Sequence, residues 1–463
     1  MSTMTASDAP AAVSQKASRD ASQSWAIIGG GMLGLTLALR LSEAGQRVTV
    51  FEAAPSFGGL ASAWQIGGVT WDRYYHVISQ RDRRLLALLE ELGLADDVRW
   101  GVTRTNFYTG RSMHPLNNAI DYLRLPVLGI IDKARLAATI LWAARIENGT
   151  PLERMSAEAW LTRLSGRTTY QKLWRPLIRS KLGANDKKAS AAYIWSVIRR
   201  FYGARQGKMK TEMFGYVTGG YHHVVERLAA RLRGAGVTLE AATPVTAVTP
   251  AGAGFELRAG EETRHFDRVV NTCAAPIAMR VCDGLSAEER ARHLAISYQG
   301  VVCASLLLDR PLGGAYLTYI TDESVPFTTV IEMSSLIDAS LTDGKYLVYL
   351  PRYVPADDPL LEASDEDIEA RFLPALLRMF PDLKREEIGA FKVARTRHVL
   401  AISTLDYSAK LPPMATSLPG LSIVNSAQIV NASLSVDESI RLAEEAAAAL
   451  LQDQAVCAEA AAS

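Results

Sequence analysis

A glycine-rich turn between two apolar segments restricts what this chain can fold into. Residues 25–28 (Trp-Ala-Ile-Ile) form a short apolar run, and residues 29–34 (Gly-Gly-Gly-Met-Leu-Gly) follow it with the spacing G-x-G-x-x-G. Residues 35–44 then show helical periodicity, and a second apolar run over 47–52 ends in Glu52. This order predicts a buried parallel strand, a tight turn, a helix and a second strand.

The residue types in this turn suit the binding of a dinucleotide. Gly29 permits the tight turn, Gly31 lets the backbone approach a pyrophosphate, and Gly34 allows close packing of helix on strand. The backbone N–H groups of Met32 and Leu33, at the start of the helix, are then available to phosphate oxygens. Glu52 is placed to accept hydrogen bonds from ribose hydroxyls, and an acid there argues against a 2′-phosphate.

A second glycine pair helps to decide whether the dinucleotide is NAD or FAD. Gly58 and Gly59 follow Glu52 and precede Leu60. Here the sequence resembles the flavin-dependent amine oxidase superfamily, which includes protoporphyrinogen oxidase, phytoene-type desaturases and UDP-galactopyranose mutase. The resemblance implies an FAD whose pyrophosphate and flavin lie close to the glycine pair. Arg usually follows this pair in the superfamily, so Leu60 departs from the pattern at one phosphate contact.

The resemblance covers most of residues 25–451 and implies further cofactor contacts. The segment 67–78 is similar to the one that runs beneath the flavin, and Val245 matches the position whose backbone contacts adenine. Near the C-terminus the usual Gly-Asp is replaced, and the flavin-contact candidates there have ordinary cap or turn roles as an equal alternative. These candidates are Asn425, Ser426, Gln428, Ser435 and Asp437. A helix over 437–451 would direct its N-terminus toward the flavin.

The implied fold is a two-domain α/β protein. A discontinuous Rossmann-like FAD-binding domain would be assembled from residues 24–100, 212–275 and 396–452. Residues 101–211 and 276–395 would form a substrate domain of antiparallel sheet plus helices. The Ala/Ser/Thr-rich residues 1–23 predict a disordered tail, and the Ala-rich residues 453–463 predict a flexible one.

The near-neutral total charge conceals a cationic region. The chain has 50 Lys and Arg against 49 Asp and Glu, but residues 161–210 hold thirteen basic side chains and one acid, Asp186. A solvated helical face, an anionic-substrate site that uses Arg175 and Arg179, and a contact with membrane headgroups all fit this window. No nucleic-acid-binding module accompanies it, so nucleic acid is not an expected partner.

No segment predicts a membrane-spanning helix or a secretory signal, which favours a cytoplasmic protein. Residues 123–146 are apolar with interspersed charges, and are interpreted as core helices or as an interfacial element that would associate with a membrane. The four cysteines lack metal-site spacing, so no metal centre is predicted.

Two residues are candidates for catalysis. His76 lies in the segment that the resemblance places near the flavin and could act as acid or base or orient substrate, and the alternative is a structural histidine hydrogen-bonded to backbone. Glu332 ends a predicted strand over 326–332 and is either a cavity acid or a surface acid. Tyr75 and Tyr298 are further candidates for lining the substrate site. Superfamily amine oxidases place a lysine near the flavin, and residues 301–308 and 326–332 contain none.

The function predicted from these features is that of an FAD-dependent oxidoreductase. It would transfer a hydride between flavin N5 and a small, anionic or lipidic substrate. Two alternatives remain open. One is a non-redox, FAD-dependent isomerase of a nucleotide sugar, and the other is a flavin-binding accessory protein without turnover.

Overall fold

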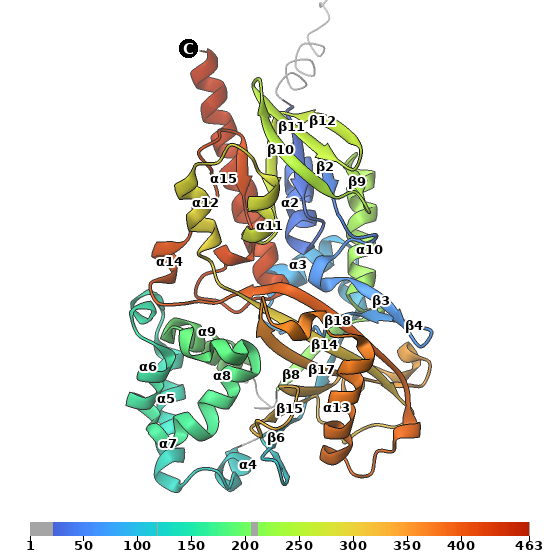
Figure 1. Cartoon of the computed structure of the whole chain (residues 1–463), viewed down its shortest axis with the longest axis vertical. Coiled ribbons are helices and arrows are strands. Elements are labelled where there is room, and N and C mark those ends of the chain that lie inside the picture. The colour runs from blue at the N-terminus through green and yellow to red at the C-terminus, as the bar shows by residue number, and fades with distance from the viewer. Residues whose placement is uncertain (1–21, 118, 205–211, 463) are drawn as a thin grey trace, which may run out of the picture.

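The computed structural model describes residues 22–117, 119–204 and 212–462 (Figure 1). One part contains a parallel sheet with the order β19-β13-β1-β2-β9. Its strands are β1 (Ser24–Ile28), β2 (Arg47–Phe51), β9 (Thr238–Glu240), β13 (Arg268–Asn271) and β19 (Leu421–Ile423). The predicted parallel strand, turn, helix and strand are therefore present, with α2 (Met32–Glu43) as the helix.

Side chains alternate between the two faces of this sheet. Trp25 and Ile27 pack into a core with α2, α10 (Gly220–Gly234) and α15 (Val436–Ala462). Ala26 and Ile28 face the opposite core, formed with the antiparallel strands β10 (Val245–Ala251), β11 (Gly254–Ala259) and β12 (Glu262–Phe266) and with α11 (Ala275–Val281). Both faces of the parallel sheet are thus covered, as its continuous apolar strands require.

A seven-stranded sheet forms the second part, with the order β18-β14-β17-β16-β15-β6-β7. The bounds are β6 (Thr105–Tyr108), β7 (Met113–Pro115), β14 (Tyr298–Leu308), β15 (Leu317–Ile320), β16 (Thr329–Glu332), β17 (Tyr346–Pro355) and β18 (Ile388–Ala401). Every neighbouring pair is antiparallel except β6 and β15. Val302 and Ala304 face α13 (Asp365–Met379), whereas Val301 and Cys303 face the opposite side, toward β4 (Val69–Asp72).

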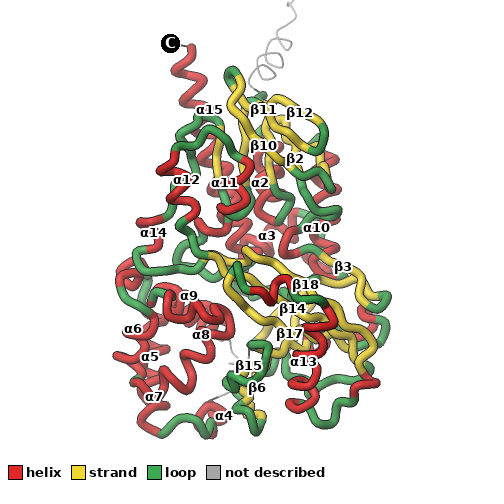
Figure 2. The backbone as a smooth tube through the Cα atoms, viewed as in Figure 1, coloured by secondary structure: helices red, strands yellow, loops and turns green. Residues whose placement is uncertain are grey.

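A helical layer packs beside this sheet and appears in red at the lower left of Figure 2. It contains α4 (Ala119–Arg124), α5 (Ile130–Arg145), α6 (Ala157–Ser165), α7 (Arg167–Thr169), a π-helical turn (Tyr170–Trp174), α8 (Arg175–Leu182) and α9 (Ala191–Ala204). Its core holds Trp160, Trp174 and Trp195. The remaining elements are β3 (Ala63–Ile66), α3 (Arg83–Glu91), β5 (Val98–Val102), β8 (Met213–Val217), α12 (Ala287–Leu294) and α14 (Tyr407–Lys410).

The element boundaries differ from the expected domain limits in three places. β18 crosses the expected limit at 396, and α11 packs against β10 although residues 276–395 were assigned to the substrate part. α15 continues as helix to Ala462, where a flexible tail was predicted from 453. The predicted tail over 1–23 lies outside the described residues, apart from Ser22 and Gln23. Within the described ranges, none of the helices is long and apolar enough to cross a bilayer.

Candidate active site

The glycine turn has the geometry that its spacing predicts. Gly29 has a φ of +107°, and a Cβ there would lie 2.5 Å from Thr272 Oγ1. A Cβ on Gly34 would lie 2.0 Å from the carbonyl oxygen of Gly29, so close packing of α2 on β1 requires glycine. In contrast, a Cβ on Gly31 would meet only Gly59 Cα, at 3.9 Å. The surface of the turn is therefore open at Gly31, where a ligand backbone could approach.

The start of α2 faces this open space. Gly31 is the N-cap and supplies no side-chain hydrogen bond to the helix. The side chains of Met32 and Leu33 are buried, so only their backbone N–H groups can reach a ligand. Unbonded N–H groups together with the helix dipole favour a phosphate at this position.

The second glycine pair packs directly on the first turn. The Gly58 N–H donates to the carbonyl oxygen of Gly30 (2.8 Å), and a Cβ on Gly59 would lie 3.1 Å from Gly31 Cα. Both glycines have positive φ, +112° and +58°. Leu60 packs its side chain against the apolar cluster that contains Trp71 and Tyr349. Only the backbone of Leu60 is therefore available to a phosphate.

Glu52 follows β2 with its carboxylate directed back at the turn. Oε2 accepts from the Gly30 N–H and Oε1 from the Ala54 N–H, both at 2.8 Å. Each oxygen keeps a second lone pair that could accept from a ribose hydroxyl. The Thr243 N–H donates to the Glu52 backbone carbonyl oxygen (2.9 Å), which holds the segment just before β10 against the end of β2. The open turn, the free N–H groups and this acid together fit an extended dinucleotide.

Three of the C-terminal cofactor candidates, Asn425, Gln428 and Asp437, have side chains that accept hydrogen bonds from backbone N–H groups. Asn425 and Gln428 cap each other's backbone around Ser426–Gln428: Asn425 Oδ1 accepts from Ala427 (3.0 Å) and Gln428 Oε1 accepts from Asn425 (2.7 Å). Ser426 opens this short turn. Asp437 Oδ1 accepts from the N–H groups of Arg84 (2.8 Å) and Leu85 (2.9 Å), so it caps α3. These bonds match the cap roles that were the alternative.

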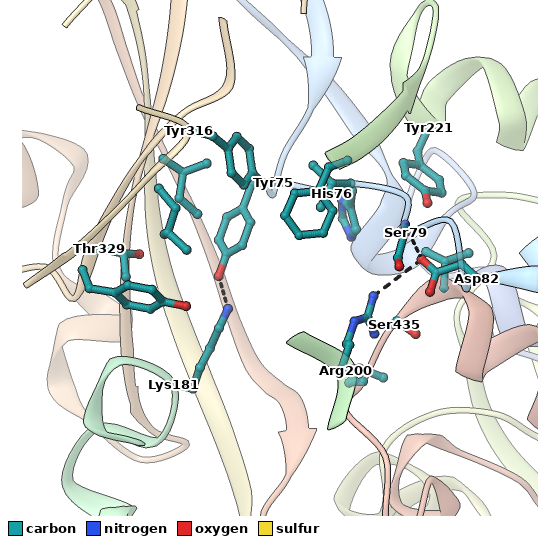
Figure 3. A pocket seen from close by; sticks show the side chains of 17 residues that line it. Tyr75, His76, Ser79, Asp82, Lys181, Arg200, Tyr221, Tyr316, Thr329 and Ser435 are labelled. Atoms are coloured by element: carbon teal, nitrogen blue, oxygen red, sulfur yellow. Dashed lines mark hydrogen bonds and ion pairs between the residues drawn. The ribbon is translucent and has the colours of Figure 1, made fainter. Parts of the chain in front are cut away.

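A cavity of about 210 Å³ lies between the two parts of the molecule (Figure 3). Ser435 and Val436 line it, so the N-terminus of α15 lies at the cavity, and its approach to a flavin stays a prediction. Most other lining side chains are apolar or aromatic. They include Val77, Phe214, Tyr221, Tyr316, Tyr319, Ile331 and Leu434.

His76 lines this cavity as a neutral imidazole. Its Nδ1 lies 2.9 Å from the carbonyl oxygen of Tyr74, so Nδ1 carries the proton and Nε2 is left as an acceptor. Burial lowers the pKa of His76 to about 4, and the nearby charge of Lys181 acts in the same direction. The ring packs 5.1 Å from that of Tyr221.

Lys181 enters the cavity from the last turn of α8. Its Nζ donates to Tyr353 Oη (3.1 Å) and to Tyr75 Oη, and these two hydroxyls lie 2.9 Å apart. Nζ also lies 4.7 Å and 4.9 Å from the centroids of the Tyr75 and Tyr353 rings. Burial raises the pKa of Tyr75 well above its usual value, so its hydroxyl stays protonated.

A second cation stands on the other side of the cavity. Arg200 lies 3.5 Å from the carboxylate of Asp82, which also accepts from the Ser79 N–H (2.9 Å). Burial raises the pKa of Asp82 while the charge of Arg200 lowers it. In Figure 3 this group lies across the cavity from Tyr75 and Lys181.

The structure does not bring four predicted site residues to the cavity. Arg175 pairs with Asp186 (3.2 Å), and Arg179 pairs with Glu323. The Tyr298 hydroxyl accepts from the Ala275 N–H (3.1 Å), beside the parallel sheet.

Glu332 is the fourth of these residues, and it lies on the opposite face of β16. Thr329 and Ile331 line the cavity, so the alternation along the strand directs Glu332 away from it. Its carboxylate accepts from the N–H groups of Leu312 (2.8 Å), Gly313 (3.2 Å) and Gly314 (2.8 Å). Burial raises its pKa and these bonds oppose that rise. Glu332 therefore holds a loop and does not line the cavity.

The cationic window predicted from the sequence does reach the cavity, but through Lys181 and Arg200 and not through Arg175 and Arg179. Lys181 and Arg200 belong to the same window. Helical periodicity could have shown that Lys181 and Arg179 lie on different faces of α8. Ile178 and Leu182 are the buried apolar positions of α8, and Lys181 is three residues after Ile178, on the same face. Arg179 lies about 200° around the helix from Lys181.

Comparison with known proteins identifies the family. The profile of the family described as "Flavin containing amine oxidoreductase" matches residues 33–451. Protoporphyrinogen oxidase of Nicotiana tabacum is 24% identical over 196 residues, which are 41% of this chain and 39% of that protein. Coproporphyrinogen III oxidase of Mycobacterium tuberculosis is 34% identical over 131 residues, which are 27% of this chain and 29% of that protein. The chain thus spans less than half the length of these curated relatives.

A solved structure supports the fold. Reduced UDP-galactopyranose mutase superposes with a TM-score of 0.71 at 16% identity, over 93% of this chain and 96% of that one. The predicted resemblance, the two-part α/β architecture and the flavin cofactor are confirmed by these matches. The chain belongs to the flavin containing amine oxidoreductase family.

Proposed function

We propose that this protein is an FAD-dependent oxidoreductase that transfers a hydride between flavin N5 and a small substrate held in the cavity. The observation that supports the proposal most is the position of the cavity. It lies at the N-terminus of α15, beside the segment 75–79 that follows the glycine turns, and its wall is largely apolar. Such a wall excludes water from a reaction in which charge moves.

In this proposal the glycine turns hold the cofactor and the cavity holds the substrate. The open backbone at Gly31 and the start of α2 would receive the diphosphate, and Glu52 would accept from ribose hydroxyls. When bound, FAD supplies the group that accepts or donates the hydride. The N-terminal end of α15 contributes a positive dipole that stabilises negative charge at the cavity.

His76 is the proposed proton acceptor. Its Nδ1–H is fixed on Tyr74, so Nε2 is the nitrogen that can receive a proton from substrate. The apolar neighbours favour the neutral ring, and Tyr75 and Lys181 orient the substrate from the opposite wall. We therefore propose the catalytic role for His76 and not for Glu332.

Anaerobic flavin bleaching tests the redox proposal. The FAD-loaded protein would be mixed without oxygen with representatives of amines, alcohols, porphyrinogens and unsaturated lipids. Loss of the oxidised-flavin absorption with one class is the expected result. If every class leaves the absorption unchanged and reduced protein is not reoxidised by any class, the redox proposal is wrong and an accessory role is favoured.

The isomerase alternative keeps the same cofactor and cavity. The fold match to a mutase and the two cations in the cavity favour it, because cations suit the diphosphate of a nucleotide sugar. Protein reduced once with dithionite would convert such a sugar repeatedly without an electron acceptor. Failure of reduced protein to convert UDP-galactopyranose, together with substrate-dependent bleaching, contradicts this alternative.

We also propose a peripheral membrane contact through α5. Ile130 and Ile131 are 86% and 77% exposed, and Leu141 and Trp142 are exposed on the same helix. The neighbouring elements carry exposed basic side chains at Arg124, Arg163, Arg167 and Lys172, against exposed acids at Glu147 and Glu158. Exposed apolar side chains on an element whose neighbours carry more bases than acids suit an anionic bilayer surface.

Vesicle sedimentation tests the membrane contact. The protein is expected to sediment with phosphatidylserine-containing vesicles and less with phosphatidylcholine alone. Replacing Ile130 and Ile131 with Asp should abolish this binding, whereas Leu294→Asp, at an exposed leucine on α12, should leave it unchanged. Equal sedimentation of all three proteins contradicts the proposal.

A further inference from the structure

The ammonium of Lys181 has only neutral partners among the described residues. Its hydrogen bonds go to the hydroxyls of Tyr75 and Tyr353, and the two rings flank it at 4.7 Å and 4.9 Å. Tyr353 is buried, and Tyr75 and Lys181 are half-buried, so the lysine side chain is partly shielded from water. The cation–π contacts offset part of the hydration that the ammonium loses. Without an anionic partner, the remaining desolvation of the ammonium still costs free energy.

The acid that lines the cavity does not neutralise Lys181. Asp82 lies with Arg200 and Ser79 on the other side of the cavity. His76 is neutral, and Glu332 is directed away on the opposite face of its strand. The described lining therefore carries two cations and one anion, and the excess positive charge is at Lys181.

The tyrosines hold the ammonium in a fixed place. Tyr75 follows β4 and Tyr353 belongs to β17, while Lys181 comes from α8, so three separate segments meet at Nζ. An ammonium has three donors, and the two hydroxyls use two of them. One donor is left for a ligand in the cavity. Beyond Nζ the cavity is lined by apolar and aromatic side chains, including Tyr316 and Ile331.

We infer that the cavity binds an organic anion, and that Lys181 is its anchor. The carboxylate or phosphate of the ligand pairs with Nζ, and an apolar body lies against Tyr316 and Ile331. Tyr75 and Tyr353 are positioning residues that act through Lys181. This inference rests on the proposed function for the location of the substrate, and it narrows the substrate class to amphiphilic acids. It also moves the anion site from Arg175 and Arg179 to the opposite face of α8.

Calorimetric titration of the FAD-loaded protein with three small probes tests the anchor. Benzoate carries a carboxylate on a phenyl ring and phenyl phosphate carries a phosphate on the same kind of ring. Benzyl alcohol is the neutral analogue. At least one of the anions is expected to bind ten or more times tighter than benzyl alcohol. Equal affinity for all three probes overturns the inference, and this comparison requires no variant.

Substitutions then assign the preference to one residue. Lys181→Met should weaken binding of the preferred anion at least tenfold and leave benzyl alcohol within twofold, whereas Lys181→Arg should retain the anion within a few fold. Lys172→Met is the matched control, because it removes the same charge from the same basic window at an exposed position outside the cavity. An anion preference that survives Lys181→Met, or that Lys172→Met also removes, overturns the inference.

Failure of this inference is distinct from failure of the proposed function. If anions bind through Lys181 but no compound class bleaches the flavin, the anion site is retained and the redox proposal is wrong. If compounds bleach the flavin but Lys181→Met leaves the preference for anions unchanged, the redox proposal is retained and the anchor is wrong.

Discussion

Gly31 and Gly34 are three residues apart, and their surroundings are opposite. A Cβ on Gly34 would overlap the Gly29 carbonyl oxygen, whereas a Cβ on Gly31 would enter open space at a φ of −74° that alanine adopts freely. The two glycines therefore have different roles in this chain. One is required by the fold, and the other is required by the ligand that we place over the turn.

This contrast predicts different outcomes for two alanine variants. Gly34→Ala should destabilise the protein by about 3 kcal/mol or more, because a methyl group is forced against backbone. Gly31→Ala should change the free energy of unfolding by less than about 0.5 kcal/mol and weaken FAD binding at least about tenfold. Urea unfolding of the apoprotein and flavin fluorescence titration measure the two effects. Unchanged FAD affinity in Gly31→Ala would remove the diphosphate from this turn.

His76 gives a pH-dependent prediction. Its pKa is about 4 in the folded protein against an ordinary value of 6.5, so below pH 6.5 the unfolded chain takes up a proton that the folded protein does not. Stability is therefore lost as the pH falls from 6.5 toward 4. Between pH 7 and pH 5 the wild type should lose roughly 1–2 kcal/mol more than His76→Gln. His265→Gln, at an exposed histidine, should behave as the wild type in urea unfolding at both pH values.

At the scale of elements, the sequence predicted what local chemistry determines. The glycine spacing and the apolar runs located β1, α2 and β2. The choice among thirteen cations depended on which face of α8 meets β17, and a long-range contact of that kind leaves little trace in local sequence. Glu332 was misplaced for a related reason, because the face of β16 is decided by its partners in the sheet.

Asp437 tests this distinction between local and tertiary roles. It belongs to the first turn of α15, yet its carboxylate accepts from two N–H groups of α3. Asp437→Ala should reduce the free energy of unfolding by about 1 kcal/mol, and Asp437→Asn, which keeps an acceptor oxygen, by less. Urea unfolding measures both variants. A shifted flavin spectrum with unchanged stability would instead restore the flavin contact that was predicted from the sequence.

At the scale of the whole molecule, the cofactor would connect segments that are distant in the chain. The residues assigned to it come from the first turn, from the start of β10 and from the approach to α15. A ligand that binds only the folded state stabilises it by mass action, by about 2.7 kcal/mol at a concentration of 100 Kd. Adding FAD to the apoprotein should therefore raise the thermal midpoint, as calorimetry would record. The same addition should raise the midpoint of Gly31→Ala less, because this variant is expected to bind FAD more weakly, and an equal rise in both proteins would contradict the assignment.

The strand order of the parallel sheet also determines when this sheet can form during synthesis on the ribosome. β1 precedes its neighbour β13 by some 240 residues, and β19 forms the edge of the sheet only at Leu421–Ile423. A nascent chain that has been made only as far as β2 therefore contains the glycine turn but not β13. It also lacks Thr272, which follows β13 and lies against Gly29 in the folded protein. Domains fold as units during synthesis, so the part of the protein that contains the parallel sheet is completed only after β19 has been made.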